Sequence, residues 1–205
     1  MKYKYYIYDF DGTISDSYPT FTKAFMKMLD DFGIPDTYEN VYAKLKVSFG
    51  NACSSYDFPP TDKKVSQIYA EYRVPLMPIY AKPFDDAEKL LATVIENGGK
   101  NYIYTHSGQI AWDLLEMWGL KKYFSGGVTA DMKFPGKPAP DALNYLCEKE
   151  GLDKAQCVMI GDRDIDILAG QNAGMDGILL DPGSKYFPNF KATYNVDTLE
   201  EIIDI

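Results

Sequence analysis

The fold is decided by residues 3–13, which read YKYYIYDFDGT. The Tyr- and Ile-rich start of this segment is typical of a β-strand, and we predict a strand over residues 2–9. Residues two apart in a strand point to the same side, and Gly12 allows a sharp turn directly afterwards. Asp9 and Asp11 are therefore expected to crowd one mouth of a sheet. Such a pair is unfavourable unless a cation or a proton separates the carboxylates, so it suits chemistry on a charged substrate.

Three later segments carry further polar groups at the ends of apolar runs or in loops before helices. Residues 103–108 read IYTHSG, residues 136–140 read GKPAP, and residues 158–166 read VMIGDRDID. Between Pro83 and the C-terminus the sequence alternates strand and helix patterns, which predicts a parallel sheet with helices on both faces. Ligands of such sheets bind beyond the carboxyl ends of the strands, where all of these segments fall.

The four segments together resemble the motifs of the haloacid dehalogenase-like hydrolase superfamily, whose members are mostly phosphatases. The matching residues, in motif order, are Asp9 and Asp11, then Thr105, then Lys137, then Asp162 with Asp166. The resemblance covers nearly the whole chain and implies a Rossmann-like parallel sheet with an α-helical cap inserted after the first motif. The cap position and the form of the fourth motif are similar to those of the phosphoglycolate phosphatase and β-phosphoglucomutase-like group.

The predicted domains are a catalytic core of residues 1–15 and 81–205 and a helical cap of residues 16–80. In the cap we expect a helix from Pro19 to Phe32, another over 38–46, and a polar loop over 47–55. A third helix is expected from about Asp62 to Arg73, with Pro75 and Pro78 breaking it. In the core, we expect Asp85 to cap a helix that ends before Gly98 and Gly99. The remaining expected elements are strands 100–105, 125–128, 156–160, 176–180 and 193–196 and helices 108–118, 140–150 and 164–173.

The resemblance implies a role for each core residue. Asp9 is the expected nucleophile, which would form an aspartyl-phosphate, and Asp11 the expected general acid–base. The second aspartate also favours phosphate chemistry, because the dehalogenase branch of the family lacks it. Asp162 is expected to hold Mg²⁺ together with Asp9 and the main-chain carbonyl of Asp11, and Asp166 to lie behind these ligands.

Thr105 and the main-chain N–H groups of His106 and Ser107 are expected to bind phosphate oxygens, since they precede a helix N-terminus. Lys137 would pair with the phosphate and with Asp9. His106 is the only histidine of the chain, and its side chain is expected to be a bystander or to lie near the substrate.

Three cap residues, Ser48, Gly50 and Asn51, lie in the segment that the resemblance places over the active site. They are the expected substrate contacts in the cap. The expected substrate is a small phosphorylated metabolite.

The composition of the chain argues against some classes of binding partner. The chain has 205 residues, a net charge of -9 and a pI near 4.6, which argues against nucleic acid or an anionic membrane as a partner. Its three cysteines, Cys53, Cys147 and Cys157, form no CxxC pattern, and the latter two lie in apolar runs typical of core positions. With no signal-peptide or membrane-span pattern, we expect a cytoplasmic protein that is a monomer or a weak dimer.

Two other functions remain open from the sequence. A sugar-phosphate mutase of the same fold would return the phosphoryl group to its substrate instead of passing it to water. A non-catalytic metabolite-binding protein would keep the fold but is expected to lose a nucleophile or a metal ligand, and here every motif residue is present.

Overall fold

The computed structural model describes residues 1–59 and 63–205, and the chain divides into two compact units. One unit comprises Met1–Ser15 and Pro83–Ile205, and the other comprises Asp16–Lys82. The short strands β2 (Ser15–Asp16) and β3 (Lys82–Pro83) pair with each other where the chain passes from one unit to the other and back. Among the described residues, no helix has both the length and the apolar character that crossing a membrane requires.

The first unit is built on a six-stranded sheet in the order β5-β4-β1-β6-β7-β8, and every pairing in it is parallel. The strands are β1 (Tyr5–Tyr8), β4 (Lys100–Tyr104), β5 (Phe124–Val128), β6 (Cys157–Gly161), β7 (Asp176–Leu180) and β8 (Tyr194–Val196). Strand β1 lies between β4 and β6, and Tyr8 pairs with Ile103 on one side and Ile160 on the other. The first, second and fourth motifs therefore follow the carboxyl ends of three adjacent strands, β1, β4 and β6, on the same side of the sheet.

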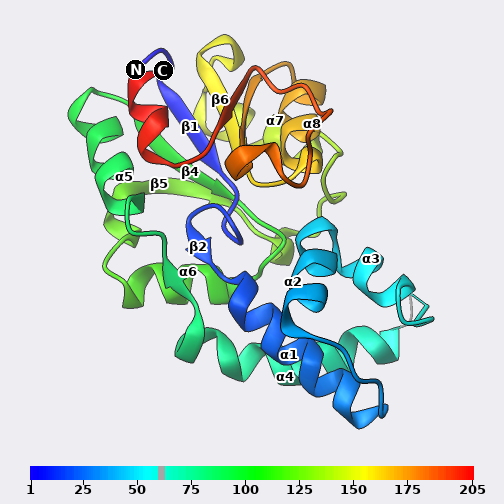
Figure 1. Cartoon of the computed structure of the whole chain (residues 1–205). Coiled ribbons are helices and arrows are strands. Elements are labelled where there is room, and N and C mark those ends of the chain that lie inside the picture. The colour runs from blue at the N-terminus through cyan, green and yellow to red at the C-terminus, as the bar shows by residue number, and fades with distance from the viewer. Residues whose placement is uncertain (60–62) are drawn as a thin grey trace. The chain divides into compact units, whose positions relative to one another are not determined.

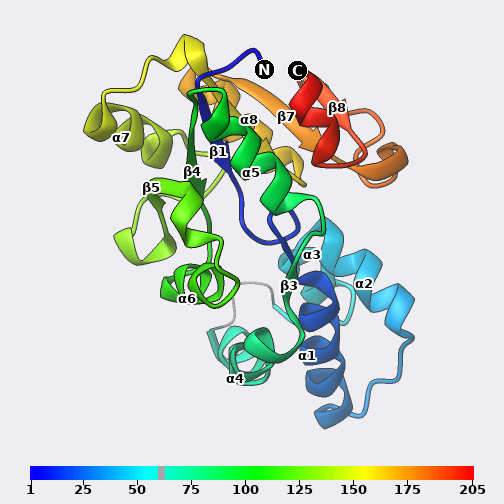
Figure 2. The same cartoon turned by 90° about the vertical axis from the view of Figure 1, so that its left-hand side faces the viewer.

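Helices cover both faces of this sheet (Figures 1 and 2). They are α5 (Ala87–Glu96), α6 (Gln109–Met117), α7 (Asp141–Glu150) and α8 (Asp164–Ala173). On one face, apolar residues of α7 and α8 such as Leu146 and Ala169 join Ile7 and Met159 of the sheet in a single buried cluster. On the other face, the Asn101 amide of β4 donates a 2.9 Å hydrogen bond to the Leu91 carbonyl of α5. This layering confirms the predicted α/β class with a parallel, Rossmann-like sheet.

Five short 3₁₀ segments complete the first unit. They are η1 (Lys121–Tyr123), η2 (Ala130–Met132), η3 (Lys154–Gln156), η4 (Pro182–Ser184) and η5 (Glu200–Asp204).

The second unit is helical. Its helices are α1 (Tyr18–Asp31), α2 (Tyr38–Val47), α3 (Phe49–Ser54) and α4 (Lys63–Tyr80). The apolar face of α1, with Phe25 and Met28 fully buried, packs against α2 and α4 around Val41 and Tyr69. The rings of Phe49 and Tyr69 stack with their centroids 4.8 Å apart.

The prediction of a polar loop over residues 47–55 is wrong, because α3 occupies Phe49–Ser54. Ser48 explains the helix: its hydroxyl accepts a 2.8 Å hydrogen bond from the N–H of Asn51, as an N-cap does. Gly50 lies in the first turn, where the N–H groups have no intrahelical partner in any case. The buried Ala52 and Cys53 then hold the helix against the core of the unit.

The prediction that Pro75 and Pro78 break the third cap helix is also wrong, since α4 runs through both of them to Tyr80. Each proline removes one main-chain hydrogen bond, to the carbonyl of Glu71 or Val74. Both prolines and both of these residues are exposed, so water can reach that side of the helix. The buried Met77 keeps the last turns packed. The expected start at Asp62 lies outside the described residues.

The predicted cap of α5 is displaced by one residue. The helix begins at Ala87, and the N-cap position belongs to Asp86 instead of Asp85. The Asp86 carboxylate does not cap its own helix; it accepts a 3.0 Å hydrogen bond from the N–H of Glu200 near the C-terminus. The Asp86 side chain therefore binds a residue far away in the sequence instead of its own helix, and the local sequence pattern cannot reveal such a contact.

Candidate active site

Asp9 begins the candidate site, directly after β1. Its N–H donates a 2.8 Å hydrogen bond to the carbonyl of Ile160 in β6, which extends the pairing of the two strands by one step. The residue is 8 % exposed. The start of the motif is thus fixed by the sheet itself, and Gly12, with φ of +80°, provides the turn that follows.

Lys137 connects two carboxylates at this edge. Its ammonium nitrogen lies 2.8 Å from Oδ1 of Asp9 and 2.7 Å from Oδ1 of Asp166, and its side chain is 1 % exposed. The ammonium also lies over the ring of Tyr104, 4.6 Å from the centroid. Burial disfavours the charged form, but the attraction of Asp166 and Asp9 outweighs it and raises the pKa of Lys137. Lys137 is therefore a fixed positive charge at neutral pH.

A buried acidic cluster surrounds this lysine. Carboxylate oxygens of Asp9, Asp162 and Asp166 lie within 4.8 Å of one another. Burial is the main effect that raises the pKa of Asp9 and brings the pKa of Asp166 to about 7, while Lys137 opposes the shift and neighbouring carboxylates add to it. Three acids against one ammonium leave the cluster short of positive charge. An all-oxygen donor set of this kind fits a hard divalent cation.

The position of Asp166 depends on two local features. Its Oδ2 accepts a 3.1 Å hydrogen bond from the N–H of Arg163, within the capping box at the start of α8. Gly161 at the end of β6 leaves the space that Asp166 fills: a Cβ there would lie 2.3 Å from Cβ of Asp166. The nearby Asp164 has a local contact instead: its carboxylate accepts a 2.8 Å hydrogen bond from the N–H of Ile165 at the start of α8.

Asp11 contacts the second motif. Its Oδ2 accepts a 2.7 Å hydrogen bond from the hydroxyl of Ser107, and the N–H of Ser107 donates to Oγ1 of Thr105 at 2.9 Å. The Ser107 N–H, expected to point at phosphate, is thus used within its own loop in this structure. The contact between Asp11 and the Ser107 side chain was not foreseen, because nothing in the sequence pairs residues 96 positions apart.

His106 contacts the third motif. Its Nε2 accepts a 3.0 Å hydrogen bond from the N–H of Lys137, so the ring is neutral in this arrangement. Burial of the ring, with Lys137 and Arg163 nearby, lowers the pKa of His106 to about 4, although the residue taken as a whole is exposed. The side chain that was expected to be a bystander or to lie near the substrate thus contacts the loop that presents Lys137.

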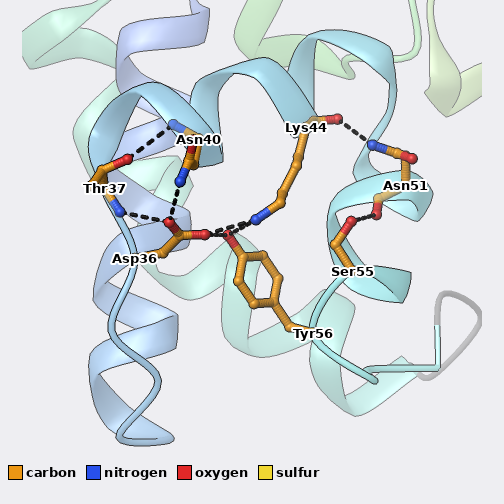
Figure 3. A network of polar contacts seen from close by, with 7 residues as sticks. All are labelled: Asp36, Thr37, Asn40, Lys44, Asn51, Ser55 and Tyr56. Atoms are coloured by element: carbon orange, nitrogen blue, oxygen red, sulfur yellow. Dashed lines mark hydrogen bonds and ion pairs between the residues drawn. The ribbon is translucent and has the colours of Figure 1, made fainter.

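The expected cap contacts lie in the second unit, and Figure 3 shows the local partners of one of them, Asn51. Ser48 caps α3, and the Asn51 amide donates to the main-chain carbonyl of Lys44 at 3.1 Å. The main-chain carbonyl of Asn51 accepts a 2.8 Å hydrogen bond from the Ser55 hydroxyl. Ser48 and Asn51 therefore stabilise the corner between α2 and α3, and the contact of Ser48, Gly50 and Asn51 with substrate stays a prediction.

The structure gathers the predicted core residues into two groups of direct contacts. Lys137 contacts Asp9, Asp166 and His106, with Asp162 close by, and Ser107 contacts Asp11 and Thr105. Sequence reasoning missed Tyr104, whose ring faces the Lys137 ammonium. The signal for it is its position one residue before Thr105, at the end of a strand next to β1.

Comparison with known proteins agrees with this arrangement. The family model described as haloacid dehalogenase-like hydrolase matches residues 6–180. The chain is 29 % identical over 186 residues to the fructose-1-phosphate phosphatase YqaB of Escherichia coli, covering 86 % of this chain and 96 % of that protein. It is also 29 % identical to a phosphoglycolate phosphatase of Psychrobacter arcticus, covering 88 % of this chain and 84 % of the other.

Solved structures show the same fold. A hydrolase from Streptococcus pneumoniae TIGR4 matches over 100 % of both chains with a TM-score of 0.69 and 32 % identity. A haloacid dehalogenase-like family protein from Streptococcus pneumoniae matches with a TM-score of 0.81 and 18 % identity, over 99 % of this chain and 98 % of the other. The match of the family model to most of the chain, motifs included, means that this protein belongs to the haloacid dehalogenase-like hydrolase family.

Proposed function

We propose that this protein is a Mg²⁺-dependent phosphatase that hydrolyses the phosphoric monoester of a small metabolite through an aspartyl-phosphate on Asp9. The observation that carries the proposal is the Lys137 ammonium held between Asp9 and Asp166 inside a buried acidic cluster. Phosphoryl transfer needs positioning and charge neutralisation more than covalent machinery, and this edge of the sheet offers both. The names of the relatives support the substrate class, since they include phosphatases of fructose 1-phosphate, phosphoglycolate and N-acetylmuramic acid 6-phosphate.

Asp9 is the proposed nucleophile. One carboxylate oxygen, Oδ1, is held by Lys137 at 2.8 Å, and the main chain is fixed to β6, so the carboxylate is oriented before substrate arrives. The other oxygen would attack phosphorus in line with the leaving alcohol. Burial raises the pKa of Asp9, and the Lys137 ammonium opposes this shift and so favours the ionised, nucleophilic form.

Asp11 is the proposed general acid–base. It would give a proton to the leaving alcohol and later remove one from the water that hydrolyses the aspartyl-phosphate. The hydrogen bond from the Ser107 hydroxyl holds Oδ2 of Asp11 and fixes the orientation of the carboxyl group.

The residues proposed to hold Mg²⁺ are Asp9, the main-chain carbonyl of Asp11, and Asp162, with Asp166 behind them. The close approach of the Asp9, Asp162 and Asp166 carboxylates supports a cation here. When bound, the ion would neutralise the carboxylates and polarise the phosphoryl oxygens.

Phosphate oxygens would be bound by Lys137, the Thr105 hydroxyl and the main-chain N–H groups of the His106–Ser107 turn before α6. The Ser107 N–H would have to leave Thr105 to take part, since it donates there in this structure. Ser48, Gly50 and Asn51 remain the proposed cap contacts of the substrate.

The test is Mg²⁺-dependent phosphate release from a panel of sugar phosphates, phosphoglycolate, nucleotides and an aryl phosphate. We expect release that disappears with a chelator and with Asp9→Asn. The matched control is Asp113→Asn, the same chemical change at an exposed carboxylate of α6, which should keep full activity. A folded protein that releases no phosphate from any compound with Mg²⁺ present would refute the proposal.

The second candidate is a mutase of the same fold, because the same aspartyl-phosphate can return its phosphoryl group to a second hydroxyl of the sugar. Product analysis separates the two: a mutase yields an isomeric sugar phosphate and little free phosphate. Turnover of either kind would exclude the non-catalytic alternative.

A further inference from the structure

One aromatic ring packs against the buried ion pairs of the candidate site. Tyr104 is the last residue of β4, directly before Thr105, and it is 3 % exposed. The Lys137 ammonium lies over its ring, with 4.6 Å between the nitrogen and the ring centroid. The ring therefore borders the same ammonium that is proposed to bind the phosphate.

The hydrogen-bond donors of the Lys137 ammonium are only partly used by the carboxylates. An ammonium has three N–H donors. Two carboxylate oxygens lie at hydrogen-bonding distance, Oδ1 of Asp9 at 2.8 Å and Oδ1 of Asp166 at 2.7 Å. The face of an aromatic ring attracts a cation through its quadrupole and does not compete with oxygen as a conventional acceptor. One donor of the ammonium is thus left for a phosphate oxygen.

The Tyr104 ring also contacts the residue that holds the main chain of Lys137. The ring of His106, whose Nε2 accepts the Lys137 N–H, packs edge-on against Tyr104, with 6.4 Å between the centroids and 88° between the planes. The buried Tyr104 hydroxyl has no hydrogen-bond partner among the residues that the structure describes. The ring, and not the oxygen, is therefore the part of Tyr104 that contacts the site.

We propose that Tyr104 is a positioning residue of the phosphatase reaction, an inference that rests on the proposed function. Its ring face keeps the Lys137 ammonium beside the Asp9 carboxylate, so that the ammonium can bind a phosphate oxygen while the nucleophile keeps its orientation. A cation–π contact is strongest where water is excluded, and the Lys137 side chain is 1 % exposed. Without the ring, the ammonium could turn away from Asp9, and the attacking carboxylate would lose a fixed partner.

The first test is steady-state phosphate release by variants of the full-length protein. Tyr104→Leu removes the ring and keeps an apolar side chain. We expect its kcat to fall about 10- to 30-fold with a much smaller change in KM, since the orientation of the nucleophile is what is lost. Tyr104→Phe keeps the ring and should recover most of the lost kcat.

Tyr102→Leu is the matched control. It removes a fully buried ring two residues earlier on the same strand, in the same apolar cluster as Tyr104. Urea unfolding should show a similar loss of stability for Tyr102→Leu and Tyr104→Leu, because both empty space in the core. Only Tyr104→Leu should lose turnover.

The second test changes the ring face with little change of shape. Phenylalanines that carry one, two or three ring fluorines are placed at position 104. Fluorine withdraws electrons from the ring and weakens its attraction for a cation, so kcat should fall stepwise with each fluorine. This series decides the matter even if Tyr104→Leu does not fold.

Three results would overturn the inference and leave the proposed function intact. One is equal kcat of Tyr104→Leu and Tyr102→Leu, which would make both rings mere core packing. Another is a kcat of Tyr104→Phe as low as that of Tyr104→Leu, which would assign the effect to the hydroxyl. The third is a constant kcat along the fluorinated series. A wild-type protein that releases no phosphate would instead refute the proposed function, and this inference with it.

Discussion

The main-chain N–H of Lys137 donates a 3.0 Å hydrogen bond to Nε2 of His106. This bond joins the loop after β4 to the loop that presents Lys137, and the same lysine holds Asp9 and Asp166 through its ammonium. His106 can thus influence the site by fixing the main chain of Lys137, whose ammonium holds the carboxylates. His106 is in this sense a positioning residue.

We predict that His106→Ala lowers kcat more than it raises KM. A net hydrogen bond contributes roughly 1 kcal/mol, which corresponds to about a fivefold change in rate. His106→Gln should recover part of the loss, because its side-chain oxygen can accept the same N–H. Steady-state kinetics on the best substrate of the panel would measure both. Equal kcat for the alanine, glutamine and wild-type proteins would show that the bond does not matter for turnover.

The same histidine should make stability depend on pH. In the folded protein its pKa is lowered from 6.5 to about 4, so between these values the unfolded chain binds a proton that the folded chain does not. Stability relative to His106→Gln should therefore be constant above about pH 6.5, fall as the pH drops towards 4, and level off below that. Urea unfolding of both proteins across this range measures the difference. A constant difference would mean that His106 titrates normally.

The strand and helix pattern of the core could be predicted from sequence because it is local. Residues 164–173 and 176–180 have the predicted bounds, since apolar periodicity and the glycine at 174 mark them. The failures have non-local causes. Helix α4 continues through Pro75 and Pro78 because packing around Met77 outweighs two lost hydrogen bonds on an exposed side. Helix α3 depends on the Ser48 hydroxyl acting as a cap, a role that serine also plays in turns.

The motifs named the core site residues, because each follows the carboxyl end of a strand or lies in a loop next to one. The resemblance implied that Lys137 pairs with Asp9, and the two are 2.8 Å apart, but the other contacts among these residues could not be predicted. The contacts of Asp11 with Ser107 and of Lys137 with His106 depend on how β1, β4 and the following loops approach in space. A motif gives the residue types and their order, and only the sheet order β4-β1-β6 brings them to one edge.

Lys137→Met should disable and destabilise the protein. It leaves Asp9 and Asp166 buried without their shared cation, and removing one partner of a buried ion pair costs about 3 kcal/mol or more. Activity should fall by about 10²-fold or more, since a fixed charge that stabilises the transition state is gone. The control is Lys149→Met, which removes an exposed lysine paired loosely with Glu150. Unfolding and phosphate release that match this control would contradict the buried-bridge interpretation.

Gly161→Ala tests how closely Asp166 must approach the end of β6. The added Cβ would lie 2.3 Å from Cβ of Asp166, so the side chain must move, and with it the ammonium of Lys137 2.7 Å from its Oδ1. We expect a stability loss of roughly 1–3 kcal/mol and a clear loss of turnover. Gly126→Ala on the edge strand β5 is the matched control, because its added Cβ meets nothing closer than 3.9 Å. Equal stability and equal turnover of the two variants would show that Asp166 can move without disturbing the site.

A network centred on Asp36 joins the residues before α2 to α2 itself and to Tyr56 after α3 (Figure 3). Its Oδ2 accepts from the Lys44 ammonium at 2.7 Å and from the Tyr56 hydroxyl at 2.6 Å, and its Oδ1 accepts from the Asn40 amide at 2.9 Å. These bonds tie both ends of the segment that carries the proposed cap contacts.

Asp36→Asn should therefore weaken the helical unit by about 1–2 kcal/mol near neutral pH, because an amide replaces a charged acceptor. Hydrogen bonds from Lys44 and Tyr56 keep the pKa of Asp36 below its usual range. Its contribution is thus complete above the ordinary aspartate pKa of about 3.9 and is lost as the pH falls through the lower, folded value. Urea unfolding of the full-length protein near neutral pH and at progressively lower pH measures this. The control is Asp57→Asn, which removes the same charge from an exposed position with φ of 58° that asparagine tolerates. If both variants lose the same stability, net charge and not the network explains the effect.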